Sequence, residues 1–209
     1  MSAAPEQILQ SVFGFPAFRP GQREIVDRLI DGTHTLSVMP TGAGKSICYQ
    51  LPALIAKHLT VVISPLVALM DDQVAGLRAN GVDAVCIHSN RSREDNVADW
   101  RQVQDGSIKL LYLSPERLMT ERMLVALQAL DPAMFVVDEA HCISQWGFSF
   151  RPEYLGLPRL RQAFPNAAFA AFTATADQAT RDEIVDRLLG PGAAVFVFGF
   201  DRPNIELRV

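Results

Sequence analysis

The stretch Thr35-Leu-Ser-Val-Met-Pro-Thr-Gly-Ala-Gly-Lys-Ser46 decides the fold. It starts as an apolar run typical of a buried strand, passes through a glycine-rich turn and enters a segment with helical spacing. Gly42 and Gly44 permit the backbone angles and the close approach that a phosphate group requires. The stretch matches the pattern Gly-x-x-x-x-Gly-Lys-Ser/Thr except at the first glycine, where Met39 stands. It therefore predicts a phosphate-binding loop rather than an ordinary glycine-rich turn.

The predicted loop offers two kinds of contact to a nucleotide. Its backbone N–H groups form an anion-binding nest at the start of a helix. The Lys45 ammonium group would reach the β- and γ-phosphates, and the Ser46 hydroxyl would ligate Mg²⁺. ATP and Mg²⁺ are thus the predicted cofactors. The loop residues expected to contact the nucleotide are Pro40, Thr41, Gly42, Ala43, Gly44, Lys45 and Ser46.

Short apolar runs alternate with longer helical patterns on both sides of this loop. Their spacing predicts an α/β fold of the P-loop type, a doubly wound and mainly parallel sheet with helices on both faces. Ligands of such sheets lie at the carboxyl ends of the strands. The predicted strands span residues 35–38, 60–63, 84–87, 109–113, 134–137, 168–172 and 194–198. The predicted helices span residues 21–30, 45–57, 66–79, 91–104, 120–130, 154–163 and 178–188.

An acidic pair follows another predicted strand, in Phe135-Val-Val-Asp-Glu-Ala-His141. Two carboxylates at the end of a buried strand are costly unless a ligand uses them. Asp138 is expected to hold Mg²⁺, and Glu139 to orient and deprotonate an attacking water. Capping of the next helix is the alternative role for the pair. His141 is either a structural histidine or a link between the γ-phosphate region and a second lobe.

Composition excludes several classes of protein. The chain has 209 residues, enough for one well-packed domain, and a net charge of −4 that gives no general attraction to nucleic acid. No apolar run reaches the roughly 18 residues of a membrane span, and the N-terminus lacks a secretory signal, so we expect a cytoplasmic protein. The cysteines, Cys48, Cys86 and Cys142, contain no Cys-x-x-Cys pair. Their spacing argues against a zinc site or disulfides and predicts small buried side chains.

Longer motifs resemble those of superfamily 2 helicases and, more narrowly, the RecQ family. Asp138-Glu-Ala-His141 is a DEAH box, and the string from Asp138 to Tyr154, Asp-Glu-Ala-His-Cys-Ile-Ser-Gln-Trp-Gly-Phe-Ser-Phe-Arg-Pro-Glu-Tyr, resembles that family. Further resembling segments are spread over nearly the whole chain. They begin with Phe13-Gly-Phe-Pro-Ala-Phe-Arg-Pro-Gly-Gln22. Two segments resemble motifs of the first lobe that contact the DNA strand, Ser64-Pro-Leu-Val-Ala-Leu-Met-Asp-Asp-Gln73 and Tyr112-Leu-Ser-Pro-Glu-Arg-Leu118. Phe172-Thr-Ala-Thr-Ala176 resembles the coupling motif that follows the DEAH box, and Phe200-Asp-Arg-Pro-Asn204 resembles the exit towards a second lobe.

The resemblance implies an adenine-reading segment near the N-terminus. Gln22 offers both a donor and an acceptor to the adenine edge, which would select ATP over GTP. Arg19 and Phe15 would enclose the base by cation–π and stacking contacts. The family usually has tyrosine where Phe15 stands, so stacking is kept and a hydroxyl contact is lost. Without the resemblance, this segment would be interpreted as an amphipathic helix followed by a turn.

The resemblance also implies an aromatic-rich loop that senses single-stranded DNA. Its expected contacts are Trp146, Phe148, Phe150 and Arg151. Exposed aromatic side chains beside arginine give a stacking platform worth roughly 1–3 kcal/mol per base, although the aromatics could also belong to the core. Phe148 stands at a usual histidine position and Asp71 at a usually basic one near the strand path. The second departure is expected to weaken contact with DNA phosphates.

The resemblance implies a first helicase lobe over residues 1–200, with residues 201–209 leading to a second lobe that this sequence lacks. An arginine finger from a second lobe can supply roughly 10³–10⁵ in rate. We therefore expect the 209-residue chain to bind ATP–Mg²⁺, to hydrolyse ATP very slowly and not to unwind DNA.

The parent protein implied by the resemblance is a 3′-to-5′ helicase of recombination and repair. It would act on single-stranded and partly duplex DNA in the cytoplasm, associated with the nucleoid if bacterial. The alternatives are an RNA helicase lobe, a remodelling ATPase that needs no nucleic acid, and a non-catalytic nucleotide-binding scaffold.

Overall fold

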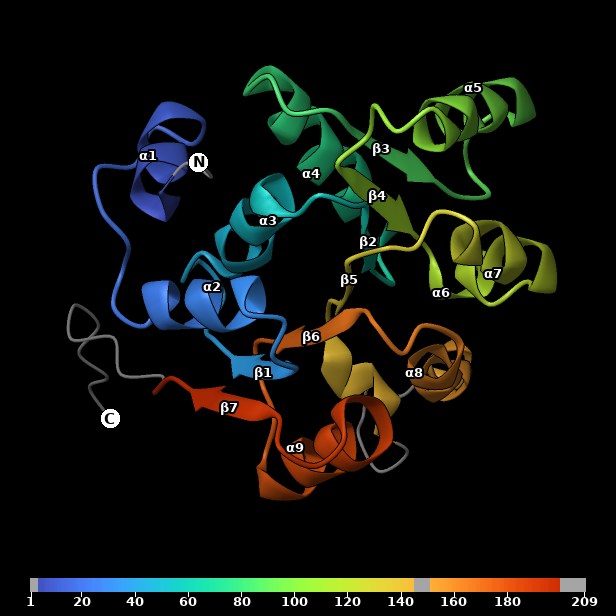
Figure 1. Cartoon of the computed structure of the whole chain (residues 1–209). Coiled ribbons are helices and arrows are strands. Elements are labelled where there is room, and N and C mark those ends of the chain that lie inside the picture. Colours follow the sequence, from blue (N-terminus) through green and yellow to red (C-terminus); the bar gives the residue numbers. More distant parts are fainter. Residues whose placement is uncertain (1–3, 145–150, 200–209) are drawn as a thin grey trace, which may run out of the picture.

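A parallel β-sheet forms the centre of the chain. The computed structural model describes residues 4–144 and 151–199, within which a seven-stranded sheet runs in the order β3-β4-β2-β5-β6-β1-β7 (Figure 1). Every strand pair is parallel, as the strand–helix alternation predicted. The strands are β1 (Thr35–Val38), β2 (Thr60–Ile63), β3 (Ala84–Ile87), β4 (Leu110–Leu113), β5 (Met134–Val137), β6 (Ala168–Thr173) and β7 (Ala194–Val197).

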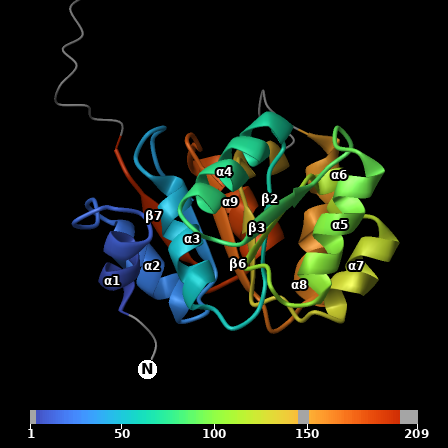
Figure 2. The ribbon, with the colours of Figure 1, turned by 90° about the horizontal axis from the view of Figure 1, so that it is seen from above.

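Helices cover both faces of the sheet, which confirms the predicted doubly wound fold. One face carries α2 (Gln22–Ile30), α3 (Lys45–Ile55) and α4 (Val67–Ala79), with α1 (Pro5–Ser11) packed outside α2 and α3. Figures 1 and 2 show α1, α2 and α3 on the side opposite to α7 and α8. The second face carries α5 (Arg93–Gln104), α6 (Pro115–Leu118), α7 (Glu121–Gln128), α8 (Leu160–Ala163) and α9 (Gln178–Ile184). The turns on that face are the 3₁₀ segments η1 (Ala140–Ile143) and η2 (Pro152–Arg159) and the π turn η3 (Val185–Leu189).

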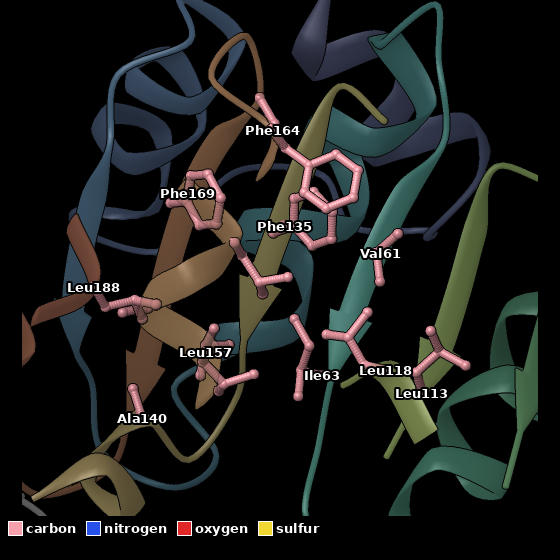
Figure 3. Close-up of a cluster of buried hydrophobic side chains, with 14 of the residues drawn as sticks. Val61, Ile63, Leu113, Leu118, Phe135, Ala140, Leu157, Phe164, Phe169 and Leu188 are labelled. Atoms are coloured by element: carbon pink, nitrogen blue, oxygen red, sulfur yellow. The ribbon is translucent and has the colours of Figure 1, made fainter. Parts of the chain in front are cut away.

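Alternate strand residues enter two separate apolar cores, because successive side chains of a strand point to opposite faces. On the second face, Phe135 of β5 is fully buried and stacks on Phe169 of β6, with 5.4 Å between ring centroids. Phe164 completes this aromatic group 4.7 Å from Phe135, as Figure 3 shows among the surrounding aliphatic side chains. The buried strands hold the sheet rigid, so that the loops at their carboxyl ends have fixed starting points.

The sequence predicted that β7 is buried on both faces, and the structure differs from this prediction. Val195 and Val197 are about half exposed, while the alternate Phe196 packs towards the core. The continuous apolar run of this strand suggested complete burial. β7 is an edge strand that pairs only with β1 in the described sheet, so its side chains have fewer neighbours than those of the central strands.

Two predicted helical regions also differ in detail. Residues 154–163 were predicted as one helix, but η2 is a 3₁₀ segment and only Leu160–Ala163 is α-helical. Pro158 lies inside this region and lacks the N–H group that an α-helix needs there. The helix predicted over 178–188 changes from α to π geometry at Val185. None of the helices in the described ranges is long and apolar enough to cross a bilayer.

Candidate nucleotide-binding and DEAH site

The phosphate loop joins β1 to α3. Gly44 caps α3 with a left-handed backbone at φ 84°, and Gly42 has φ 82°. The backbone angle of Gly44 demands glycine, and a Cβ atom added there would lie 2.4 Å from Gln22 Nε2 and displace that side chain. Lys45 Nζ donates to the Met39 carbonyl at 3.2 Å, which keeps the ammonium group over the loop. The local geometry is therefore that of a cradle for phosphate groups.

The segment between α1 and α2 lies against the phosphate loop. Gln22 is buried, and its Nε2 donates to the carbonyls of Ala43 at 3.1 Å and Gly44 at 3.2 Å. Its Oε1 accepts from the backbone N–H of Arg19 at 2.9 Å, and the Arg19 guanidinium donates to the Gly42 carbonyl. Both ends of the Gln22 carboxamide thus contact the protein, and the predicted adenine-reading residues are tied directly to the phosphate loop.

Most of the residues predicted to contact the nucleotide line one pocket of about 370 Å³. Phe15 and Arg19 come from the N-terminal segment, while the acidic residues come from the end of β5. Phe15 is 45% exposed, so its ring is accessible for stacking. The pocket is lined by Phe15, Ala17, Arg19, Gln22, Thr41, Gly42, Gly44, Lys45, Ser46, Ile47, Leu69, Gln73, Asp138 and Glu139.

Four of these lining residues, Ala17, Ile47, Leu69 and Gln73, were not predicted for the pocket. Leu69 and Gln73 lie four residues apart on α4, so they share one face of that helix. The sequence placed them in a motif interpreted only as strand-contacting. Gln73 Oε1 accepts from Gln50 Nε2 at 2.9 Å, and the same Gln50 nitrogen donates to the Tyr112 hydroxyl at 3.1 Å. The four-residue spacing of Leu69 and Gln73 on the predicted helix was the sequence signal that they share one face of that helix.

The acidic pair, Asp138 and Glu139, follows β5, and the surroundings of the two carboxyl groups shift their pKa values in opposite directions. Burial and the neighbouring Glu139 charge raise the pKa of Asp138 to about 6. A hydrogen bond from His141 holds the pKa of Glu139 below its usual value, although partial burial opposes the shift. Glu139 also has a left-handed backbone at φ 48°, which is uncommon for a residue with a side chain. Such strain accumulates where function requires a fixed orientation.

His141 connects the DEAH segment to β6. Its Nδ1 lies 2.8 Å from Thr173 Oγ1 and 3.3 Å from Glu139 Oε2. The Thr173 hydroxyl donates to the Thr175 carbonyl at 3.1 Å, which leaves its oxygen to accept from His141. Contact with the Cys142 sulfur and the hydrogen bond with Glu139 raise the pKa of His141 to about 9. An imidazolium–carboxylate pair at neutral pH therefore orients Glu139.

Tyr154 is a further supporting residue that the sequence did not identify. Its buried hydroxyl donates to the Asp138 carbonyl at 2.9 Å. Tyr154 was predicted as the first residue of a helix, with no role in the site. The hydrogen bond fixes the backbone of the acidic pair from the side opposite to the phosphate loop.

The predicted DNA-contacting residues are only partly within the described structure. Trp146, Phe148 and Phe150 lie outside the described residues. Arg151 is half-buried, and its Nη1 approaches the Pro65 carbonyl at 3.5 Å. Two segments predicted to contact a DNA strand therefore meet at Arg151. Asp71 stands at a position that is usually basic in the family and was expected near the path of the DNA strand. Its carboxylate contacts Cys86 and His88.

The residues of the pocket fit ATP–Mg²⁺ by their chemistry. The glycine cradle at Gly44 leaves no room for a side chain, and Lys45 stands beside it. Ser46 and Asp138 line the same pocket and offer the oxygen ligands that Mg²⁺ requires. A cation would also stabilise the ionised form of the buried Asp138 carboxyl.

An all-parallel sheet with a phosphate loop after β1 and an acidic pair after β5 defines a P-loop motor domain. The sequence profile of the DEAD/DEAH box helicases matches residues 19–184. The chain therefore belongs to the DEAD/DEAH box helicase family.

Within that family, the chain is similar over nearly its whole length to helicases named RecQ. It is 46% identical over 199 residues to the ATP-dependent DNA helicase RecQ of Pasteurella multocida, covering 95% of this chain and 32% of the relative. It is 42% identical to the RecQ of Synechocystis, covering 98% of this chain and 44% of the relative. The chain thus spans between a third and a half of these relatives.

Solved structures share the fold at low sequence identity. A hypothetical ATP-dependent RNA helicase from Sulfolobus tokodaii superposes with a TM-score of 0.69 at 18% identity, covering 92% of this chain and 57% of the other. The DUF1998 helicase MrfA gives the same TM-score at 17% identity, covering 92% of this chain and 32% of the other. These likenesses support the architecture alone.

Proposed function

We propose that this chain is the ATP-binding first lobe of a DNA helicase that couples ATP hydrolysis to movement along single-stranded DNA. The observation that carries the proposal is the single pocket in which Gln22, Lys45 and Glu139 meet. Residues 1–200 form the lobe, and residues 201–209, which lie outside the described structure, lead towards a second lobe.

The pocket residues have different roles in phosphoryl transfer. Lys45 and the loop amides would hold the phosphates, and Ser46 and Asp138 would hold Mg²⁺, which would supply positive charge beside the transferred group. Glu139, oriented by His141 at 3.3 Å, positions and deprotonates the attacking water. Phe15, Arg19 and Gln22 contact the adenine. An arginine from a second lobe would supply most of the transition-state stabilisation, so the lobe alone hydrolyses ATP slowly and does not unwind DNA.

The link between His141 and Thr173 supports a coupling role for this lobe. DNA contacts made by Trp146, Phe148, Phe150 and Arg151 lie close in sequence to the acidic pair, and His141 joins that pair to β6. We propose 3′-to-5′ movement on single-stranded and partly duplex DNA during recombination and repair. We place this activity in the cytoplasm, associated with the nucleoid if the source is bacterial.

Replacing Arg151 with alanine is expected to weaken binding of single-stranded DNA in a salt-dependent way. The logarithm of the association constant falls linearly with the logarithm of the salt concentration, and each lost phosphate contact makes this slope less negative by about 0.7. Fluorescence anisotropy with a labelled oligonucleotide measures this across a salt series. Arg122→Ala is the matched control, because Arg122 is exposed on α7 and carries the same charge.

The same titration separates the competing functions. Equal affinity for an RNA strand of the same sequence would point to an RNA helicase lobe. Binding of neither strand, or an equal loss in the Arg122 control, would contradict a DNA-contacting role for Arg151. It would then favour a remodelling ATPase that needs no nucleic acid.

A further inference from the structure

Three metal-ligating side chains meet where α4 packs on the edge strand β3. Asp71 Oδ1 lies 3.1 Å from Cys86 Sγ and 3.2 Å from His88 Nε2, and all three ligand atoms lie within 4.8 Å of one another. Cys86 belongs to β3 and His88 follows it two residues later, so their side chains face α4 on the same side of the sheet. The fold therefore assembles one carboxylate, one thiol and one imidazole at a single point.

This cluster is separate from the nucleotide pocket. Leu69 and Gln73 line that pocket from one flank of α4. Asp71 lies two residues from each of them, and at about 100° per residue its side chain points to the opposite flank. None of the three cluster residues lines the pocket.

The spacing of the ligand atoms fits one tetrahedral ion. Zn²⁺ lies about 2.3 Å from a thiolate sulfur and about 2.0–2.2 Å from nitrogen and oxygen, so its ligand atoms are roughly 3.3–3.6 Å apart. The separations of Asp71 Oδ1 from Cys86 Sγ and His88 Nε2 need only a few tenths of an ångström of adjustment, and Cys86 Sγ and His88 Nε2 lie within 4.8 Å of each other. Sulfur and imidazole ligands favour zinc over magnesium or calcium. One carboxylate and one thiolate also balance the charge of a divalent ion.

The surroundings provide access and support. The Asp71 side chain is 51% exposed and the His88 ring only 1%, so an ion can enter past Asp71 towards a ring held by packing. Asn96 Nδ2 donates to the His88 carbonyl at 3.0 Å and steadies its backbone. Arg91 Nη1 lies 3.5 Å from Cys86 Sγ, where an N–H group stabilises a thiolate. Asp99 pairs with Arg91 and offsets its charge beside the site.

We propose that Asp71, Cys86 and His88 bind one Zn²⁺ ion that fastens α4 to β3, with water at the fourth position. Binding converts the Cys86 S–H bond to an S–Zn bond and passes the thiol proton to the solvent. Cys86 Sγ donates to Asp71 Oδ1 at 3.1 Å, so the thiol carries its proton before the ion arrives. One proton is therefore released by Cys86 for each ion bound. The ion would hold the flank of α4 opposite to Leu69 and Gln73.

Cobalt spectroscopy tests this site without any measurement of activity. The reduced, metal-stripped chain is titrated with Co²⁺ in excess Mg²⁺, because a near-ultraviolet charge-transfer band reports a thiolate ligand and oxygen sites give none. We expect the chain to bind one equivalent of Co²⁺ and Zn²⁺ to displace it. Calorimetry in buffers of different ionisation enthalpy should show the release of about one proton for each ion bound. Zn²⁺ at a 100-fold excess over Kd should raise the Tm by roughly 5–11 °C.

Variants of the three ligands locate the ion. Cys86→Ser should abolish the band, and His88→Gln and Asp71→Asn should weaken binding by at least about 10–100-fold, the loss typical even of outer partners. Asp72→Asn is the matched control on the same helix and should bind like the unaltered chain. Circular dichroism confirms that each variant folds. Absence of the band in the unaltered folded chain, its survival in Cys86→Ser, or equal losses in Asp71→Asn and Asp72→Asn would overturn the proposal and leave a hydrogen-bonded cluster only.

Discussion

Replacing Lys45 with alanine is expected to weaken binding of ATP–Mg²⁺ by at least about 100-fold. Lys45 begins α3 directly after Gly44, and its ammonium group stands over the phosphate loop. A hydrogen bond to a charged group contributes about 1.5–3 kcal/mol, and the ammonium can contact more than one phosphate. A loss of about 3 kcal/mol corresponds to roughly 100-fold in Kd.

Isothermal calorimetry measures this change directly. Lys57→Ala serves as the control, because Lys57 is exposed just beyond the end of α3 and its removal changes the net charge equally. The control should bind ATP–Mg²⁺ like the unaltered chain. A Kd for Lys45→Ala within about threefold of the unaltered value would contradict the assignment of the loop, because even one charge-assisted contact exceeds that difference.

Replacing Phe135 with alanine is expected to lower the free energy of unfolding by about 3–5 kcal/mol. Its ring is fully buried between Phe164 and Phe169, so truncation leaves a cavity and removes two aromatic contacts. For a domain of this size, each kcal/mol shifts the Tm by about 2–4 °C, which gives a fall of roughly 6–20 °C.

Differential scanning calorimetry measures the fall in Tm. Val125→Ala is the control, since Val125 is 61% exposed on α7 and its truncation should change stability by no more than about 0.5 kcal/mol. Similar Tm values for both variants would contradict the burial of Phe135 at the centre of the second core.

The strands were largely predictable from the sequence, because each is a short apolar run bounded by polar or glycine residues. The bounds of four predicted strands, including Thr35–Val38 and Met134–Val137, match the structure. Helix ends were less predictable. Thr120 was placed inside a helix, whereas its hydroxyl caps α7 by accepting from the Met123 N–H. α6 was not predicted as a helix, because Pro115–Leu118 is too short to show a helical period.

The site was predictable where one local motif carries its chemistry. The phosphate loop and acidic pair each fall in a short segment, and both line the same pocket. Contacts between distant segments were not predictable. The Tyr154 hydroxyl reaches the Asp138 carbonyl only through the packing of η2. Cysteine spacing argued against zinc, since it detects ligand pairs close in sequence, whereas Asp71 lies on α4 and Cys86 on β3.

Titration of the chain with ATP and with GTP, each with and without Mg²⁺, tests the central claim most directly. The account predicts Mg²⁺-dependent binding of ATP and at least about tenfold weaker binding of GTP, because the Gln22 carboxamide would exchange its bonds to the Ala43 and Gly44 carbonyls for the donor and acceptor of the adenine edge. Equal affinity for the two nucleotides would contradict the adenine-reading role of Phe15, Arg19 and Gln22. No binding of either nucleotide by the folded chain would contradict the claim that this lobe forms the nucleotide site by itself.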